Sequence, residues 1–528
     1  MTRWTSIRRV FFLLPMLCAC APQLSLGEPC ALPSDCPAPL TCLLDRCRSE
    51  CATNRDCPEG AMCLLHEASG ARACRTLDEL TCAATERCVG GLSCVRGRCV
   101  QPCTETADCG GTVCASLEEE RVCVEPGETC AVAEDCGLGI CLDGRCDEVR
   151  SLNAGERATC LLLESGRLLC AGSNLNSLLS GDDTVRFVPA FERVLDTAGT
   201  QPAFESIELG ASHACALAAG RVRCWGGGEV GQNGAGANIP PIPSPLSVLS
   251  QVQQIAAARV TSCARTEDAV FCFGWDQFGQ LGDAASHGTE SAWSAAPVRV
   301  ELPDGVVPIQ LHTSGFHACV VDTVGAVYCW GGNDFAQISP GPSTLCPFLE
   351  MEYGCEPTPV RIDGFGPGET RAVQVVVGQS HTCILDDAGA VHCFGQNHYG
   401  QLGVGAIADR VPTPVVPIAG GVRALDAGLY FTCALLMDGR LSCWGRNNAG
   451  QLGTGAGPTS IAPTDVDGLH DVADFSCGEE HACAVQTNGN VYCWGAAGAG
   501  RLGNDPEGPD DRGPVPVPVR VFAGLAAR

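Results

Sequence analysis

Short apolar runs punctuated by glycine recur along most of the chain. The clearest is CWGRNNAGQLGTG at 443–455, and neighbouring copies of it lie 48 to 64 residues apart. The other six copies begin at Cys170, Cys224, Cys272, Cys329, Cys393 and Cys493. Ahead of each copy lies a second run that carries another cysteine. Self-similarity at such a period indicates one supersecondary unit repeated seven times, as in a solenoid or a propeller.

The cysteine spacing predicts that each unit contains a β-hairpin with a disulfide across it. Five copies have nine residues between the two cysteines, which places a glycine third in a three-residue loop, where hairpins favour it. The other two copies have eight residues between the cysteines, and a two-residue loop then places the two cysteines directly opposite each other as well. Opposed antiparallel residues have Cα atoms about 4.5 to 5.5 Å apart, within disulfide range. The predicted pairs are Cys160–Cys170, Cys215–Cys224, Cys263–Cys272, Cys319–Cys329, Cys383–Cys393, Cys433–Cys443 and Cys483–Cys493.

A further strand, marked by proline and valine, precedes six of the seven hairpins. PTPVRID at 357–363 and PTPVVPI at 412–418 are typical. The first hairpin lacks such a strand, and the missing one occurs as VPVPVRVFAG at 515–524. We therefore predict that the C-terminal strand completes the sheet of the first hairpin and closes a ring without an open edge. The segments expected to line its channel are dominated by Ala, Leu, Val and Ser.

Phosphate binding is the alternative interpretation of the glycines, and the surrounding residues exclude it. A phosphate-binding loop leads into a helix whose N-terminus holds the anion, and the P-loop adds a lysine. None of the copies has a lysine or a helical pattern after it. The glycines are therefore interpreted as turns at strand ends.

The repeated motif H-x-C-A-L…G-x-V-x-C-W-G-x-N-x-x-G-Q-L-G resembles the regulator of chromosome condensation repeat. The resemblance covers about 149–528 and implies an all-β, seven-bladed β-propeller. Departures from the motif include Ala171 in place of the aromatic residue and FAQIS at 335–339 in place of GQLG. The eukaryotic founder of that family catalyses nucleotide exchange on a nuclear GTPase, whereas exported bacterial propellers of this type act by binding a protein.

The apolar pattern differs in 30–148, which has few large apolar side chains and five groups of four cysteines. Such small modules cannot fold without cross-links, so we predict two disulfides in each, with three connectivities open. The C-x5-C spacing and a single histidine, His66, argue against zinc. The pattern is similar to the Dickkopf N-terminal cysteine-rich repeat, which implies a binding or spacer role. The groups are Cys30, Cys36, Cys42, Cys47; Cys51, Cys57, Cys63, Cys74; Cys82, Cys88, Cys94, Cys99; Cys103, Cys109, Cys114, Cys123; and Cys130, Cys136, Cys141, Cys146.

The N-terminal residues read as an export signal. A basic stretch precedes an apolar one at 10–17 that is too short to span a bilayer. The string LCAC at 17–20 resembles the bacterial lipobox, which implies a signal peptide at 1–19, lipidation of Cys20 and, from the alanine that follows, the outer membrane. An ordinary signal peptide with Cys20 oxidised is the alternative. Residues 20–29 would then link the anchor to the cysteine-rich segment.

Composition limits the partners and the compartment. The chain has 60 acidic and 33 basic residues, for a formal net charge of −27, which repels nucleic-acid phosphates and anionic headgroups. Its 39 cysteines favour an oxidising compartment. We therefore expect no nucleic-acid partner, and membrane contact through a lipid anchor only.

The sequence suggests no catalytic, cofactor or metal site. His213, His317, His381 and His481 recur two residues before a hairpin cysteine, and a repeated position indicates packing. DVDGLHD at 465–471 resembles a calcium loop, but Ser476 stands where the twelfth-position glutamate is required. Cys477 has no predicted disulfide partner.

The loop at 340–357 breaks the repeat and carries its own cysteine pair, Cys346 and Cys355. Aromatic and apolar residues on a stapled loop suit a protein-binding hot spot, and folding back onto the blade is the alternative. The candidate contacts are Phe348, Leu349, Met351 and Tyr353.

These features predict a monomeric, non-catalytic surface lipoprotein whose propeller loops bind a protein or glycan. Two alternatives stay open. An exported hydrolase-like enzyme would be favoured by carboxylates on the channel-lining strands of several blades. A nucleotide exchange factor would require a cytosolic location.

Overall fold

The computed structural model describes the second part of the chain almost completely and the first part through short strands. The described residues are 41–43, 46–48, 61–65, 72–76, 93–95, 98–100, 113–117, 120–124, 140–142, 145–180, 184–194, 202–239, 249–284, 292–341, 344–348, 351–455, 457, 459–503 and 515–520. The chain separates into two compact units, one of 1–137 with 143–146 and one of 138–142 with 147–528. The lipidation site predicted at Cys20 lies outside the described residues.

The cysteine-rich segment forms small antiparallel hairpins. The strand pairs are β1 (Thr41–Leu43) with β2 (Arg46–Arg48), β3 (Ala61–Leu65) with β4 (Arg72–Thr76), β5 (Ser93–Val95) with β6 (Arg98–Val100), β7 (Val113–Leu117) with β8 (Glu120–Val124), and β9 (Ile140–Leu142) with β10 (Arg145–Asp147). In the first four, the backbone register sets the third cysteine of the module opposite the fourth, as with Cys63 and Cys74. The first two cysteines of each module lie outside the described residues, so the connectivity stays open.

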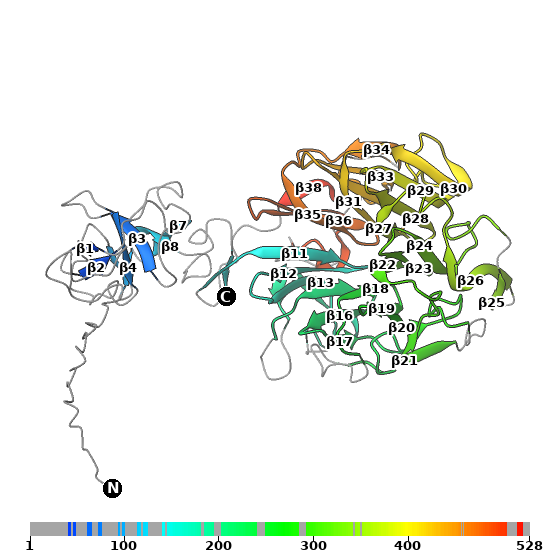
Figure 1. The fold of residues 1–528 in the computed structure, drawn as a ribbon, viewed down its shortest axis with the longest axis horizontal. Coiled ribbons are helices and arrows are strands. Elements are labelled where there is room, and N and C mark those ends of the chain that lie inside the picture. Colours follow the sequence, from blue (N-terminus) through cyan, green and yellow to red (C-terminus); the bar gives the residue numbers. More distant parts are fainter. Residues whose placement is uncertain are drawn as a thin grey trace, which may run out of the picture. The chain divides into compact units, whose positions relative to one another are not determined.

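The remaining strands form a seven-bladed β-propeller, as predicted (Figure 1). Blade 1 has β11 (Val149–Ala154), β12 (Ala158–Leu163), β13 (Leu168–Ser173) and β14 (Phe187–Arg193); blade 2 has β15 (Ser206–Leu209), β16 (His213–Ala218) and β17 (Arg221–Gly226). Blade 3 has β18 (Gln254–Ala257), β19 (Thr261–Arg265), β20 (Val270–Trp275) and β21 (Trp293–Arg299); blade 4 has β22 (Pro308–Ser314), β23 (His317–Asp322), β24 (Val327–Gly332), β25 (Thr344–Phe348) and β26 (Met351–Arg361). Blade 5 has β27 (Ala372–Val377), β28 (His381–Asp386), β29 (Val391–Asn397) and β30 (Ala408–Ile418); blade 6 has β31 (Val422–Ala427), β32 (Phe431–Leu436), β33 (Leu441–Arg446) and β34 (Thr459–Asp465). Blade 7 has β35 (Val472–Cys477), β36 (His481–Gln486), β37 (Val491–Gly495) and β38 (Val515–Arg520).

The predicted closure by the C-terminal strand is wrong in its partner. Strand β38 pairs with β37 and completes blade 7, whereas the first hairpin is completed by β14, which follows it. The proline- and valine-marked strands therefore belong to the preceding hairpin in each described case, and an inner strand precedes every hairpin. The ring closes by contact between blades 7 and 1, where Ala154 N donates to Ser476 Oγ at 3.1 Å and Glu479 N donates to Gly155 O at 3.2 Å. The physical reason is that strands consecutive in the chain tend to be neighbours in one sheet, and the inner strand that precedes each hairpin already occupies its other edge.

Each propeller hairpin carries the disulfide that its spacing predicts. The seven pairs occupy opposed positions, and their Cα atoms are 4.1 Å apart. In the three-residue loops the glycine adopts a left-handed conformation, for example with φ +82° at Gly439. The two-residue loop of blade 2 has positive φ at both Ala219 and Gly220, as a type I′ hairpin turn requires.

The GQLG segment is a hydrogen-bonded connector between blades. In blade 5, Gln401 Oε1 accepts from Tyr399 N at 2.9 Å, and Asn397 Oδ1 accepts from Leu402 N at 3.1 Å. The Gln401 carbonyl accepts from the Nε1 of Trp444 in blade 6 at 2.9 Å. The degenerate FAQIS copy keeps the internal bonds through its own Asn and Gln. The repeated Asn and Gln therefore fix the shape of the connector, and the Trp joins it to the next blade.

Candidate functional site

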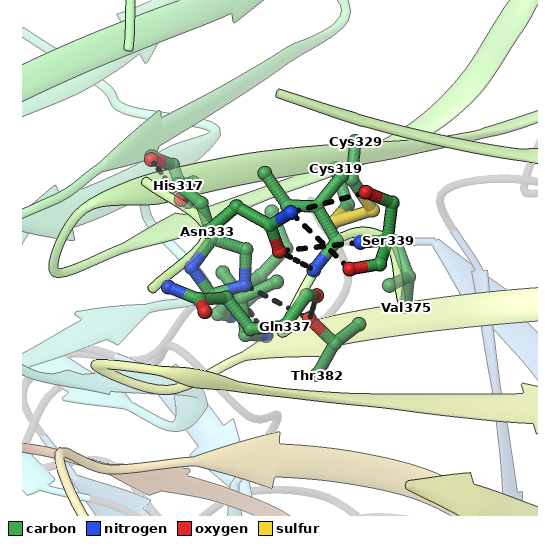
Figure 2. Close-up of a disulfide and its surroundings, with 12 residues drawn as sticks. His317, Cys319, Cys329, Asn333, Gln337, Ser339, Val375 and Thr382 are labelled. Carbon is green, nitrogen blue, oxygen red and sulfur yellow. Dashed lines mark hydrogen bonds between the residues drawn. A yellow bond between two sulfur atoms is a disulfide. The ribbon is translucent and has the colours of Figure 1, made fainter. Parts of the chain in front are cut away.

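The histidine that lies two residues before the hairpin cysteine in four of the seven blades connects neighbouring blades. His317 Nε2 lies 2.9 Å from Thr382 Oγ1 of the next blade, and that hydroxyl donates to the Gln337 carbonyl at 2.7 Å (Figure 2). Because the single hydroxyl proton goes to the carbonyl, the hydroxyl must accept from the histidine, whose Nε2 therefore carries a proton. The equivalent pairs are His213–Ser262 at 2.7 Å, His381–Thr432 at 3.0 Å and His481–Thr159 at 2.8 Å.

These four histidines lack the properties of a catalytic base. All four are buried, and burial lowers the pKa of His213, His317 and His381 to about 3. The pKa of His481 is also lowered well below its usual value, by burial and then by the charge of Arg501. A neutral ring enclosed between blades contacts neither solvent nor a substrate. The repeated position therefore has a packing role.

The histidine position of one blade and the hydroxyl position of the next blade vary together from one blade junction to another. A histidine stands in one blade wherever the next blade offers a hydroxyl, and this includes the junction from His481 of blade 7 to Thr159 of blade 1. At the other three junctions an alanine replaces the hydroxyl residue and no histidine faces it. Those position pairs are Ala158 with Ala214, Thr261 with Ala318, and Phe431 with Ala482.

The inner strands surround a channel with a cavity of about 320 Å³. Side-chain amides on these strands pair with the backbone of the next blade. Gln374, for example, donates from Nε2 to Leu425 O and accepts at Oε1 from Leu425 N, both at 2.9 Å. Gln254 and Gln310 make the same two bonds with their neighbours. The channel wall is therefore a ring of inter-blade hydrogen bonds.

Carboxylates also line the channel, beside the Ala, Leu and Ser residues that the sequence led us to expect there. Glu208, Asp426 and Asp474 come from three inner strands that lie ahead of the hairpins. Burial, reinforced by the charge of Asp426, raises the pKa of Glu208 to about 8, and burial raises that of Asp474 to about 6. Each carboxylate accepts a bond from the preceding or following blade, such as Cys477 N to Asp426 Oδ2 at 2.7 Å.

Other channel features carry little chemistry. Within the described ranges, no group of three or more His, Cys, Asp or Glu residues is placed to hold a metal ion. Cys477 is buried with a free thiol, and burial raises its pKa well above the usual value.

None of the helices that the structure describes is long and apolar enough to cross a membrane.

The loop predicted to contact a partner is an extra hairpin of blade 4, formed by β25 and β26. A disulfide joins Cys346 to Cys355, as predicted. Met351 is 56% exposed, but Tyr353 turns inward and packs edge-to-face against Phe278, with ring centroids 5.5 Å apart. Leu349 and the side chain of Phe348 lie outside the described part. The hairpin therefore both presents a surface and folds back onto its neighbour.

An aromatic pocket of about 390 Å³ lies beside this hairpin, on the face that carries the GQLG segments. Antiparallel order places the first and third turns of a blade at the same end, so residues from blades 3 to 6 meet there. Its rings pack edge-to-face or tilted against one another. The ring centroid of Phe278 lies 5.3 Å from that of Phe316 and 5.5 Å from that of Trp275. The rings that line it belong to Trp275, Phe278, Phe316, Phe335, Tyr353 and Tyr430.

Two acceptors face this aromatic pocket. Asp334 is exposed and accepts one backbone bond from Gly354 N at 2.6 Å. Partial burial raises its pKa. Gln379 Oε1 is buried and has no hydrogen-bond partner among the described residues. Sequence reasoning found only Tyr353 of this site, because its residues come from four blades.

The repeats themselves match known family models. One model described as "Regulator of chromosome condensation (RCC1) repeat" matches 388–435 and 438–485, and a second of the same description matches 372–401, 422–451 and 472–501. The chain contains RCC1 repeats. The matched segments cover parts of blades 5 to 7.

Curated relatives share the RCC1 repeats over part of their length. The probable E3 ubiquitin-protein ligase HERC6 of Homo sapiens is 28% identical over 54% of this chain and 27% of its own length. The ultraviolet-B receptor UVR8 of Arabidopsis thaliana is 30% identical over 41% of this chain and 47% of its own. The chain therefore spans less than half the length of either relative.

Solved structures share the fold. Human WBSCR16 superposes with a TM-score of 0.57 at 20% identity, covering 68% of this chain and 94% of the other. Prp20p of Saccharomyces cerevisiae superposes at 0.55 and 19% identity, covering 71% and 88%. Prp20p binds Gsp1p and histones.

Proposed function

We propose that this chain is an exported, lipid-anchored surface protein whose propeller binds a protein partner, or a glycan, without catalysis. The aromatic pocket beside the Cys346–Cys355 hairpin carries the proposal. Aromatic rings and an exposed Met351 concentrate apolar area at one place on an otherwise strongly acidic protein, as a binding hot spot does. The binding of Prp20p to Gsp1p and histones supports the use of such a propeller for recognition.

The anchor and the compartment rest on the sequence. The lipobox-like string at 17–20 and the cysteine-rich segment both fit export, and the disulfides across the propeller hairpins fit an oxidising compartment. The cysteine-rich segment would then act as a spacer between the lipid and the propeller.

An exported hydrolase-like enzyme is the second candidate, because Glu208, Asp426 and Asp474 bring carboxylates into the channel. Two observations favour binding over catalysis. Each of these carboxylates is engaged by an inter-blade hydrogen bond. The aromatic pocket is lined by other residues and includes none of these three carboxylates. A nucleotide exchange role would need a cytosolic chain with reduced cysteines.

Location and partner binding can be tested together in the native host. Protease treatment of intact cells should release propeller peptides, and non-reducing mass mapping should find them disulfide-linked. The variant Cys20→Ala should lose lipid labelling and leave the cell surface. Intracellular chains with free thiols would overturn the proposal.

A photo-crosslinking residue placed at Met351 should capture a surface partner. The matched control is Met437, which is 69% exposed in the hairpin turn between β32 and β33, at the opposite end of its blade. Cross-links at both positions alike would point to non-specific contact, and would count against a binding site at the pocket.

A further inference from the structure

We infer that the aromatic pocket takes a protonated lysine or arginine side chain of a protein partner. The inference rests on the proposed binding function and names the chemistry of the group bound. Three observations carry it: the rings, the polar groups among them, and a filled counterpart on the same face.

The rings provide several π-faces and edges around one space. Trp275, Phe316 and Phe335 are partly buried, so parts of each ring stay open to the pocket. A cation within about 6 Å of an aromatic centroid is attracted by the ring quadrupole, most strongly when partly desolvated. An aliphatic side chain would gain burial here but would not use the polar groups.

Two of the polar groups that line the pocket have free capacity to accept hydrogen bonds. The Asp334 carboxylate has accepted one backbone N–H and has further lone pairs. Gln379 Oε1 is buried without a partner in the described chain. An ammonium or guanidinium group offers donors only, so it suits this pair of acceptors.

A filled version of this arrangement lies next to the pocket. The guanidinium of Arg446 sits 5.5 Å from the ring centroid of Tyr399 and 5.7 Å from that of Tyr430, and Arg446 Nη1 lies 3.0 Å from Glu480 Oε1. Tyr430 also lines the pocket. The neighbouring site therefore combines aromatic rings, a carboxylate and a cation of the chain itself. The pocket has the rings and the carboxylate of Asp334.

Charge complementarity points to the same partner. The chain carries a net charge of −27, which draws cationic surfaces toward it and repels anionic ones. A basic protein surface would be attracted at a distance, and one of its side chains would then enter the pocket.

The probe for this inference is the peptide acetyl-Gly-Lys-Gly-amide, followed by saturation-transfer NMR on the full, oxidised chain. The same peptide with norleucine in place of lysine keeps the aliphatic stem and removes the charge. We expect the lysine peptide to bind about tenfold more tightly than the norleucine peptide. Asp334→Asn should weaken lysine binding about fivefold or more, because it removes the counter-charge and keeps the shape.

Asp304→Asn is the matched control, since Asp304 is an exposed aspartate in the loop after β21, away from the pocket. It should leave binding unchanged. Equal binding of the two peptides, or equal binding to Asp334→Asn and the unmodified protein, would overturn the cationic assignment. Tighter binding of N-acetylglucosamine at the pocket would overturn it in favour of a glycan. Partner capture at Met351 that persists after such a result would show that protein binding survives and only the ligand chemistry is wrong.

Discussion

The hydrogen bonds between histidine and hydroxyl make a quantitative comparison possible at two adjacent blade junctions. Replacing Thr382 by Val keeps the shape and removes the hydroxyl that accepts from His317 and donates to Gln337 O. Phe394 stands where blades 2, 4, 6 and 7 have Trp, so no indole N–H replaces the lost donor at that carbonyl. Two buried groups are then left without partners, at about 1 to 3 kcal/mol each, so Thr382→Val should cost about 4 kcal/mol.

The matched change Thr432→Val should cost about half as much. Its hydroxyl makes the same two bonds, to His381 and to Gln401 O. The Gln401 carbonyl keeps a second donor, however, because Trp444 Nε1 also donates to it at 2.9 Å. Only the Nε2–H of His381 then lacks a hydrogen-bond partner, which should lower the free energy of unfolding by about 2 kcal/mol.

Urea unfolding of the full chain with its disulfides intact, followed by tryptophan fluorescence, measures both losses. The double variant His381→Phe/Thr432→Ala reproduces the residues of the next junction, Phe431 and Ala482, and should lose less stability than Thr432→Val. Equal losses of stability for the two valine variants, or a larger loss for Thr432→Val, would refute the argument that Trp444 Nε1 compensates for the lost hydroxyl at the Gln401 carbonyl.

Three further outcomes follow from burial. Burial lowers the pKa of His381 from 6.5 to about 3, so as pH falls below about 6 only the unfolded chain takes up this proton. This uptake lowers the free energy of unfolding of the unmodified protein by about 1.4 kcal/mol per pH unit. The double variant His381→Phe/Thr432→Ala lacks this histidine and should lose that much less stability per pH unit, as measured by urea unfolding at each pH. Gly378→Ala sets a Cβ into that histidine ring and should cost about 1 to 3 kcal/mol by the same assay, whereas Gly341→Ala, in open space, should change stability by less than about 0.5 kcal/mol. Iodoacetamide should label Cys477 only after unfolding, as peptide mapping will show; labelling of the native protein would contradict its burial.

Local rules account for the features that the sequence predicted well. A hairpin is defined by residues within about a dozen positions, so cysteine spacing and loop glycines were sufficient to place Cys433 opposite Cys443. The same reasoning failed for the strands between hairpins. PTPVVPI lies between two hairpins, and nothing local decides which of them it joins; the sheet assigns it to the earlier one, as β30 paired with β29.

Ring closure was encoded in the sequence in a form that local reasoning did not use. His481 near the C-terminus and Thr159 in the first blade follow the same pairing rule as His317 and Thr382. Reading that rule along the chain pairs the last blade with the first, because a buried imidazole N–H requires an acceptor. The pairing of histidine with hydroxyl thus marks four of the seven blade junctions, including the one that closes the ring.

The sequence by itself determined the number of repeats, their hairpins and their disulfides, because these depend on residues close together in the chain. Only the tertiary structure decided which strand completes each blade, that Glu208, Asp426 and Asp474 share a channel, and that rings from blades 3 to 6 form one pocket. Those features depend on which blade faces which. Several blades contribute side chains to each of them, and a single copy of the repeat gives no sign that its neighbours supply the rest.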